Sequence, residues 1–226
     1  AQAQHQIRQV LRLRPGDSIV VLDGTGRALD VELEQVTREQ SLGTIRAERE
    51  AGGEPRAQIT LYQCLLKKDN FEWVLQKCTE LGVTRFVPVE SQRTVVPLSS
   101  LGVNKLTRWA RIATEAAEQS GRGRLPVLDP PRTFAAALAD AAGYDLALIP
   151  WEEATAVTLR AAVNEASWQD ESVPRVAIFI GPEGGFAPEE VALAQSAHAR
   201  PVTLGPRILR AETAAVAAAL LVLPEL

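Results

Sequence analysis

Two segments in the last quarter of the chain combine glycine with charged side chains, and each follows an apolar stretch. The first covers residues 178–186 and reads IFIGPEGGF, and the second covers residues 204–214 and reads LGPRILRAETA. Glycines allow the backbone to approach a ligand closely, and ligands of open α/β sheets bind at the carboxyl ends of strands. We therefore expect the two glycine-bearing turns to meet in space around one ligand.

The spacing of these glycines excludes two common ligand sites. The pattern that begins at Gly181 is Gly-x-x-Gly-Gly, which differs from the Gly-x-Gly-x-x-Gly fingerprint of dinucleotide sites, and no Gly-Lys-Ser/Thr of a phosphate loop follows. An ordinary strand-to-helix turn explains the first segment equally well. For the second segment, the alternative is that Arg210 pairs with Glu212 while Thr213 caps the next helix. Because that helix is almost wholly apolar, charges at its start are costly unless they are paired or have a role in binding or catalysis.

Strands and helices alternate after Lys68. Apolar residues at helical spacing, with an N-cap at Asn70 and a stop at Gly82, predict a first helix over residues 71–81. The further predicted strands are 85–89, 146–149, 176–180 and 202–204, and the further predicted helices are 105–120, 134–142, 155–166, 188–197 and 212–223. This order favours an α/β fold with a mostly parallel sheet and helices on both faces.

Short strands and turns dominate the first third of the chain. Predicted strands cover residues 18–23, 27–36, 42–47 and 58–66, with turn-forming residues at 14–17, 24–26 and 52–55. Several short strands without a long helix are typical of a small barrel or curled sheet. We expect the chain to divide into a β-rich domain of residues 1–67 and an α/β domain of residues 68–226.

Composition restricts the class of protein. Hydrophobic residues make up 46% of the 226 residues, which is enough for a full core. No apolar run approaches the ~20 residues of a membrane helix, and the polar start lacks the pattern of a signal peptide.

Cys64 and Cys78 lie in apolar patterns, so we expect reduced core thiols in a cytoplasmic protein, and no metal site. The net charge is −4, yet basic residues outnumber acidic ones from Lys105 to Arg124, where they form either a phosphate-binding stripe or a solvated helix face.

Several motifs together resemble one known family. The segments that carry the resemblance are residues 181–186 and 204–214, KD at 68–69, QKCTELGV at 76–83, RT at 93–94, EAAEQSGR at 115–122, VLR at 10–12, GD at 16–17 and DGTG at 23–26. They are similar to the bacterial 16S ribosomal RNA (uracil-N3) methyltransferases, the RsmE family of the SPOUT class. The match spans most of the chain. One departure is that the basic, aromatic-containing segment with which family members begin is not found, and a first domain without it would lack one strand and some RNA contacts.

The resemblance implies a fold, a cofactor and an assembly. The fold is a SPOUT-type knotted, mostly parallel sheet with a C-terminal trefoil knot, preceded by a small PUA-like β-barrel domain that binds RNA. The cofactor is S-adenosylmethionine, and the assembly is a homodimer. The residues carried over as cofactor contacts are Ile180, Gly181, Glu183, Gly184, Gly185, Leu204, Gly205, Ile208, Leu209 and Arg210.

The implied reaction is methyl transfer to N3 of a uridine in 16S ribosomal RNA, either free or within the small ribosomal subunit. Uracil N3 carries a proton and is a poor nucleophile until that proton leaves. Glu183 and Glu212 are the candidates to accept it, and Arg210 is the candidate to stabilise the uracil anion at its carbonyl oxygens. We expect the electrostatic role for Arg210, and the identity of the base stays open.

Contacts with RNA are expected from the resemblance and from basic or polar residues at the ends of elements, namely Arg12, Arg93, Gln119 and Arg122. Two alternative functions remain. One is a SPOUT methyltransferase that acts on transfer RNA or on a ribose 2′-hydroxyl, and the other is a non-catalytic RNA-binding protein of the same fold.

Overall fold

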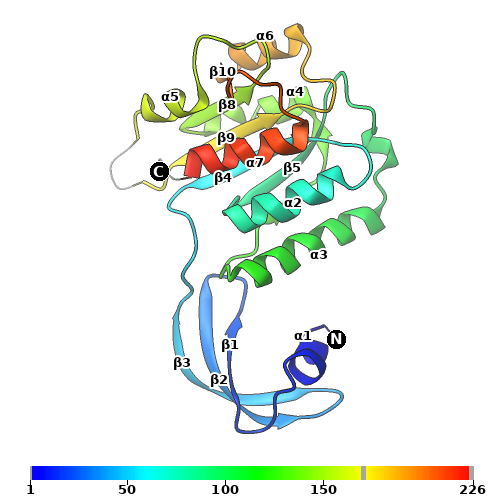
Figure 1. The fold of residues 1–226 in the computed structure, drawn as a ribbon, viewed down its shortest axis with the longest axis vertical. Coiled ribbons are helices and arrows are strands. Elements are labelled where there is room, and N and C mark those ends of the chain that lie inside the picture. Colours follow the sequence, from blue (N-terminus) through cyan, green and yellow to red (C-terminus); the bar gives the residue numbers. More distant parts are fainter. Residues whose placement is uncertain (1, 169–171, 224–226) are drawn as a thin grey trace. The chain divides into compact units, whose positions relative to one another are not determined.

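The computed structural model describes residues 2–168 and 172–223, which form two compact units. The first unit contains residues 1–54 and 121–125, and the second contains residues 55–120 and 126–226. Figure 1 labels most helices and strands of both units.

The first unit is built on a three-stranded antiparallel sheet in the order β1-β2-β3. Its elements are helix α1 (Gln2–His5), the π-helix η1 (Gln6–Val10), and strands β1 (Ser18–Leu22), β2 (Arg27–Val36) and β3 (Ser41–Glu50). The pairing of β2 with β3 shifts register at two places, and such irregularities bend a strand and increase its twist. The strands predicted at residues 18–23, 27–36 and 42–47 are confirmed as β1, β2 and β3. The short N-terminal helices were not predicted.

A later segment, residues 121–125, completes the first unit. Gly26 N–H donates to Gly123 O at 2.9 Å, and Leu125 N–H donates to Gly24 O at 3.2 Å. A side chain at Gly123 would collide with the Cβ of Ala51, so the backbones pass this closely only because residue 123 is glycine. This segment follows a long helix of the second unit. The first unit is therefore formed by two segments that are separate in the sequence.

The second unit contains a seven-stranded sheet in which every strand pair is parallel. The order is β10-β8-β9-β4-β5-β6, and β7 also pairs with β5. The strands are β4 (Gln58–Cys64), β5 (Arg85–Glu90), β6 (Val127–Leu128), β7 (Arg132–Thr133), β8 (Leu146–Pro150), β9 (Arg175–Ile180) and β10 (Ala199–Val202). The helices are α2 (Asn70–Leu81), α3 (Val103–Ser120), α4 (Phe134–Leu138), α5 (Leu159–Asn164), α6 (Pro188–Ser196) and α7 (Ala211–Val222), with short 3-10 turns at Leu98–Ser100 and Ala141–Gly143.

The boundary between the units lies earlier in the chain than expected, because strand β4 belongs to the second unit. We expected it in the first domain, which would place the boundary at 67/68, but it lies between β9 and β5 in the parallel sheet, and the units divide after Glu54. All of its residues after Gln58 are buried. A strand buried on both faces needs cover from helices on each side, and the second unit supplies that cover.

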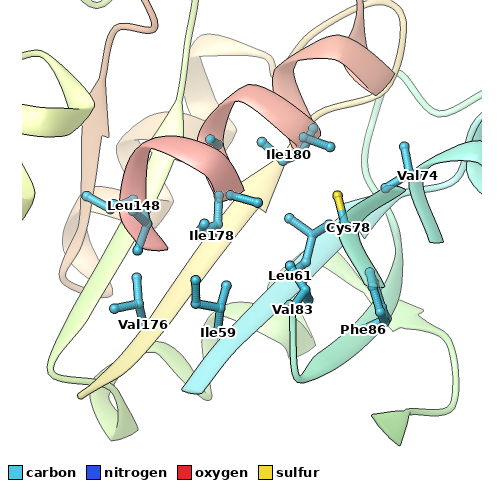
Figure 2. Packing of buried hydrophobic residues seen from close by; sticks show 14 of the residues in the cluster. Ile59, Leu61, Val74, Cys78, Val83, Phe86, Leu148, Val176, Ile178 and Ile180 are labelled. Atoms are coloured by element: carbon cyan, nitrogen blue, oxygen red, sulfur yellow. The ribbon is translucent and has the colours of Figure 1, made fainter. Parts of the chain in front are cut away.

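Helices cover both faces of this sheet. On one face, residues from β8, β9 and β4, including Leu148, Ile178 and Leu61, pack with helices α2, α3, α5 and α7. Figure 2 shows these side chains on the strands beneath α7. On the other face, Tyr62, Phe179 and their neighbours pack with α4 and α6. Because side chains alternate between the two faces of the sheet, β4 and β9 each contribute residues to two separate cores.

Most predicted elements form where expected, with shifts at their ends. Gly82 ends α2 in the left-handed region, with φ +110°, as its position predicted. Helix α5 begins later than expected, because the Thr158 side chain caps it by accepting from Ala161 N–H at 3.1 Å. Strand β10 covers residues 199–202, earlier than the expected 202–204. Within residues 2–168 and 172–223, no helix has the length and apolar character needed to cross a membrane.

The packing against α7 predicts a stability effect. Ile178 is fully buried in the centre of β9, so Ile178→Ala should lower the free energy of unfolding by about 2–5 kcal/mol. Chemical denaturation followed by circular dichroism measures this change. Val103→Ala is the control, because Val103 is 78% exposed and its truncation should change the free energy by less than about 0.5 kcal/mol. Equal losses for both variants would contradict the described core.

Candidate active site at the carboxyl edge of the sheet

Three loops of the second unit meet at one edge of its sheet. Strands β10, β8 and β9 are neighbours and run parallel, so their carboxyl ends lie together. A cavity of about 260 Å³ lies at this edge. Its wall is formed by residues 150–152 from the last residue of β8 onward, 180–186 from the last residue of β9 onward and 203–209 after β10, with Ala211 and Ala214 of α7. The expectation that the two glycine-bearing turns meet is therefore confirmed.

Every residue expected to contact a cofactor lines this cavity except Arg210. The lining includes Ile180, Gly181, Glu183, Gly184, Gly185, Leu204, Gly205, Ile208 and Leu209. The third loop, Pro150, Trp151 and Glu152, was not predicted from the sequence. A signal for it existed, because these residues follow a predicted strand at 146–149, and the rule used for the other two turns applies to this strand end as well.

The loop after β10 depends on Gly205. This glycine has φ +119°, and a Cβ there would meet no atom within 4 Å. Thr203 holds the turn, since its Oγ1 accepts from Gly205 N–H at 3.1 Å and donates to Gly205 O at 3.2 Å. Glycine here supplies the left-handed backbone and leaves open space at the cavity wall.

Charged side chains fasten the loop after β9 to its neighbours. Glu183 Oε1 accepts from the backbone N–H of Lys67 at 2.8 Å, and Arg93 Nη1 donates to Gly184 O at 3.0 Å. A Cβ on Gly184 would lie 3.3 Å from the Cβ of Arg93, so the glycine makes room for that arginine. Hydrogen bonds of ionised side chains are stronger than neutral ones, and the loop is therefore held from two sides.

Glu190 of α6 adds a further tie to the same region. Its carboxylate accepts from Gln92 N–H at 2.8 Å and from Ala187 N–H at 3.0 Å. The second bond satisfies a backbone donor at the start of α6 that the helix leaves unpaired. Glu190 thus connects the loop after β5 with the helix that follows the cavity loop.

Comparison with known proteins identifies the family. A model of the RNA methyltransferase domain matches residues 53–223, and a model of the RNA methyltransferase PUA domain matches residues 2–45. The ribosomal RNA small subunit methyltransferase E of Synechocystis sp. is 38% identical over 93% of this chain and 67% of its own length. This chain belongs to the ribosomal RNA small subunit methyltransferase E family. The same-named protein of Bacillus subtilis is 32% identical over 93% of this chain and 82% of its own length.

A solved member of the methyltransferase E family has the same fold. The crystal structure of the Neisseria gonorrhoeae protein, bound to S-adenosyl methionine, superposes with a TM-score of 0.83 at 32% identity. The match covers 96% of this chain and 86% of that one. The two family models leave a gap between residues 45 and 53, and the division of the chain after Glu54 lies two residues inside the methyltransferase match.

Of the three residues expected to be catalytic in this methyltransferase, one lines the cavity. Glu183 lines the cavity, whereas Arg210 and Glu212 lie at the start of α7 outside its wall. Arg210 is exposed and Glu212 is half-buried. In the described part of the chain, no hydrogen bond or ion pair joins Arg210 to Glu212, and Arg210, as the N-cap, makes no side-chain cap. The alternative of an Arg210–Glu212 pair therefore receives no support.

The residues expected to contact RNA differ in their accessibility. Arg12, Arg93 and Gln119 are exposed, and Arg12 has a left-handed backbone with φ +55°. Arg122 is instead buried, and its Nη2 lies 2.9 Å from Glu54 Oε2 within the first unit. Glu54 Oε1 also accepts from Arg124 N–H at 3.0 Å. The structure thus gives Arg122 a role in holding the 121–125 segment.

Neither cysteine of this methyltransferase is suited to act as a nucleophile. Burial raises the pKa of the Cys64 thiol to about 12, and burial also raises the pKa of Cys78. Both thiols are therefore protonated at neutral pH, and the thiolate is the reactive form. In the part of the chain that the structure describes, no group of three or more His, Cys, Asp or Glu side chains is arranged to hold a metal ion.

This burial predicts the reactivity of the thiols. At pH 8, far below the raised pKa values, the native protein should react with Ellman's reagent only as fast as it unfolds. In guanidinium chloride both thiols should react within the mixing time, because unfolding removes the burial that raises their pKa. A fast reaction of either cysteine in the native protein would contradict the described packing.

Proposed function

We propose that this protein uses S-adenosylmethionine to methylate N3 of a uridine in 16S ribosomal RNA. The observation that carries the proposal is the cavity walled by three loops at the carboxyl edge of a parallel sheet, in a chain of the methyltransferase E family. The Neisseria gonorrhoeae relative is described as bound to S-adenosyl methionine.

The cavity wall fits an adenosyl cofactor. Ile180, Leu204 and Leu209 supply apolar surface for an adenine ring, and the glycines of two loops bring backbone groups to the wall. Small-molecule sites combine such apolar walls with a few placed polar groups. When bound, S-adenosylmethionine supplies an electrophilic methyl group on its sulfonium sulfur.

The chain's own residues must activate the uracil. The target base has to leave its pairing and stack before N3 is reached. Arg210 is exposed and has no partner among the described residues, so its guanidinium is available to stabilise the negative charge on the uracil oxygens. Glu212 and Glu183 are the carboxylates proposed to accept the N3 proton. Of the two, Glu183 already holds the Lys67 N–H through one oxygen.

The proposal extends to the RNA contacts and the assembly. The first unit, matched by the PUA model, holds RNA with Arg12, while Arg93 and Gln119 contact it from the second unit. Helix α7 is almost wholly apolar and leaves Leu220 52% exposed, which suits burial in a homodimer interface. The trefoil knot implied by the resemblance and the cytoplasmic location expected from the reduced cysteines are part of the same proposal.

Methyl transfer from labelled S-adenosylmethionine tests the function. Purified protein is incubated with small ribosomal subunits, free 16S RNA or transfer RNA from cells that lack this modification. Label in N3-methyluridine of 16S RNA, in either form, is the expected result. Label in transfer RNA alone, or at a ribose 2′-oxygen, would overturn the substrate assignment. Absence of cofactor binding would overturn the enzymatic assignment.

Arg210→Ala separates catalysis from cofactor binding. Because Arg210 lies outside the cavity wall, its loss should lower turnover at saturating cofactor by about 100-fold or more and change the cofactor Kd by less than about threefold. Single-turnover kinetics and calorimetry measure the two effects. Arg210→Lys, which keeps the charge, should recover part of the turnover. A Kd that rises as steeply as turnover falls would place Arg210 among the cofactor contacts.

Gly205→Val tests the cofactor cavity directly. The new side chain would enter the open space beside the loop after β10, so the Kd for S-adenosylmethionine should rise at least about tenfold by calorimetry. Gly16→Val is the matched control. Gly16 also has a positive φ, of +94°, and a Cβ there would likewise meet no atom within 4 Å, but Gly16 belongs to the first unit. An equal loss of affinity in both variants would show a general effect of backbone strain.

A further inference from the structure

The third loop of the cavity carries a carboxylate at the cavity wall. The loop begins at Pro150 and is anchored to the sheet, because Trp151 N–H donates to Val202 O of β10 at 3.0 Å. It then turns, with Ala154 N–H donating to Trp151 O at 3.1 Å. Glu152 lies within this turn and lines the cavity. Its backbone is thus fixed relative to the two glycine-bearing loops.

The carboxylate of Glu152 packs against Gly185 of the neighbouring loop. A Cβ on Gly185 would lie 2.5 Å from Glu152 Oε1, and 3.2 Å from both Cδ and Oε2. Real Cβ atoms do not approach other atoms so closely, so any side chain at position 185 would displace the carboxylate. Gly185 also has φ +67°, which favours glycine for a second reason. The glycine therefore reserves a place for the Glu152 carboxylate at the cavity wall.

Glu152 differs from the other acidic residue of the wall in its bonding. Glu183 accepts a hydrogen bond from the Lys67 N–H, whereas no hydrogen bond or ion pair of Glu152 is found within residues 2–168 and 172–223. An ionised carboxylate is an acceptor only, with room for several donors. Glu152 is exposed and lines the cavity, so its carboxylate is free to accept from the donor groups of a ligand.

We propose that the Glu152 carboxylate, in the space that the absence of a side chain at Gly185 leaves beside it, accepts hydrogen bonds from the adenosyl cofactor. The donors of that cofactor are its ribose hydroxyls, the 6-amino group of its adenine and its α-ammonium group, and each can donate to a carboxylate. The inference rests on the proposed function, since it names a specificity-determining residue of the same cavity.

Calorimetry with two ligands tests the role of Glu152. Glu152→Gln should raise the Kd for S-adenosylmethionine about tenfold or more, as expected for a hydrogen bond to a charged group. Glu153→Gln is the matched control, because Glu153 is the adjacent carboxylate, is exposed like Glu152, and does not line the cavity. Its Kd should stay within about twofold of the wild-type value.

The second ligand, 5′-methylthioadenosine, separates the donors of the adenosine part from the α-ammonium, because it keeps the adenosine but lacks the amino-acid end. An equal loss of affinity for both ligands supports a contact with the adenosine part. A loss for S-adenosylmethionine alone supports a contact with the α-ammonium. If Glu152→Gln binds both ligands like the wild type, the inference is wrong. If the wild-type protein binds neither ligand, the proposed function itself fails.

A double-mutant cycle tests the link to Gly185. Gly185→Ala should weaken cofactor binding in the wild-type background, because the new Cβ displaces the carboxylate. In a Glu152→Ala background the same substitution should cost much less, since no carboxylate remains to be displaced. Thermal unfolding of each variant shows that it is folded before binding is measured. Losses of affinity that simply multiply would contradict the described contact.

Discussion

The parallel pairing of neighbouring strands is the constraint on which the site depends. Because β10, β8, β9 and β4 all run the same way, the loops that follow them leave the sheet at one edge. Those four loops supply the cavity wall and the Lys67 N–H that holds Glu183. Parallel strands need helices on both faces, and the two cores on either side of the sheet supply them. The fold thus brings together residues 150, 180 and 205, which are far apart in the sequence.

Charged residues around the cavity divide into two groups. Glu183, Arg93 and Glu190 are used by the protein itself, since each makes a hydrogen bond to a backbone group of a neighbouring loop. Loops held in this way lose little freedom when a ligand binds, which favours affinity. Arg210 and Glu152 have no such partner among the described residues. We infer that the hydrogen bonds of the first group shape the site, and that the side chains of Arg210 and Glu152 are available to contact the reacting molecules.

Local patterns were sufficient to predict most elements and both glycine-bearing loops, because periodicity and glycine conformation are properties of short segments. Long-range contacts were not predictable in this way. Strand β4 reads like the strands before it, and only its pairing with β9 and β5 places it in the second unit. The burial of Arg122 depends on Glu54, far away in the sequence. The contact between Glu152 and Gly185 likewise joins two loops whose proximity follows only from the strand order.

Hydrogen–deuterium exchange with and without S-adenosylmethionine tests most directly whether three loops enclose one ligand. If they do, saturating cofactor should slow exchange in peptides that cover residues 150–154, 180–187 and 203–209, and all three should follow a single binding curve. Strand β2 of the first unit should be unchanged. Protection confined to one of the three loops, or centred on the first unit, would contradict the account.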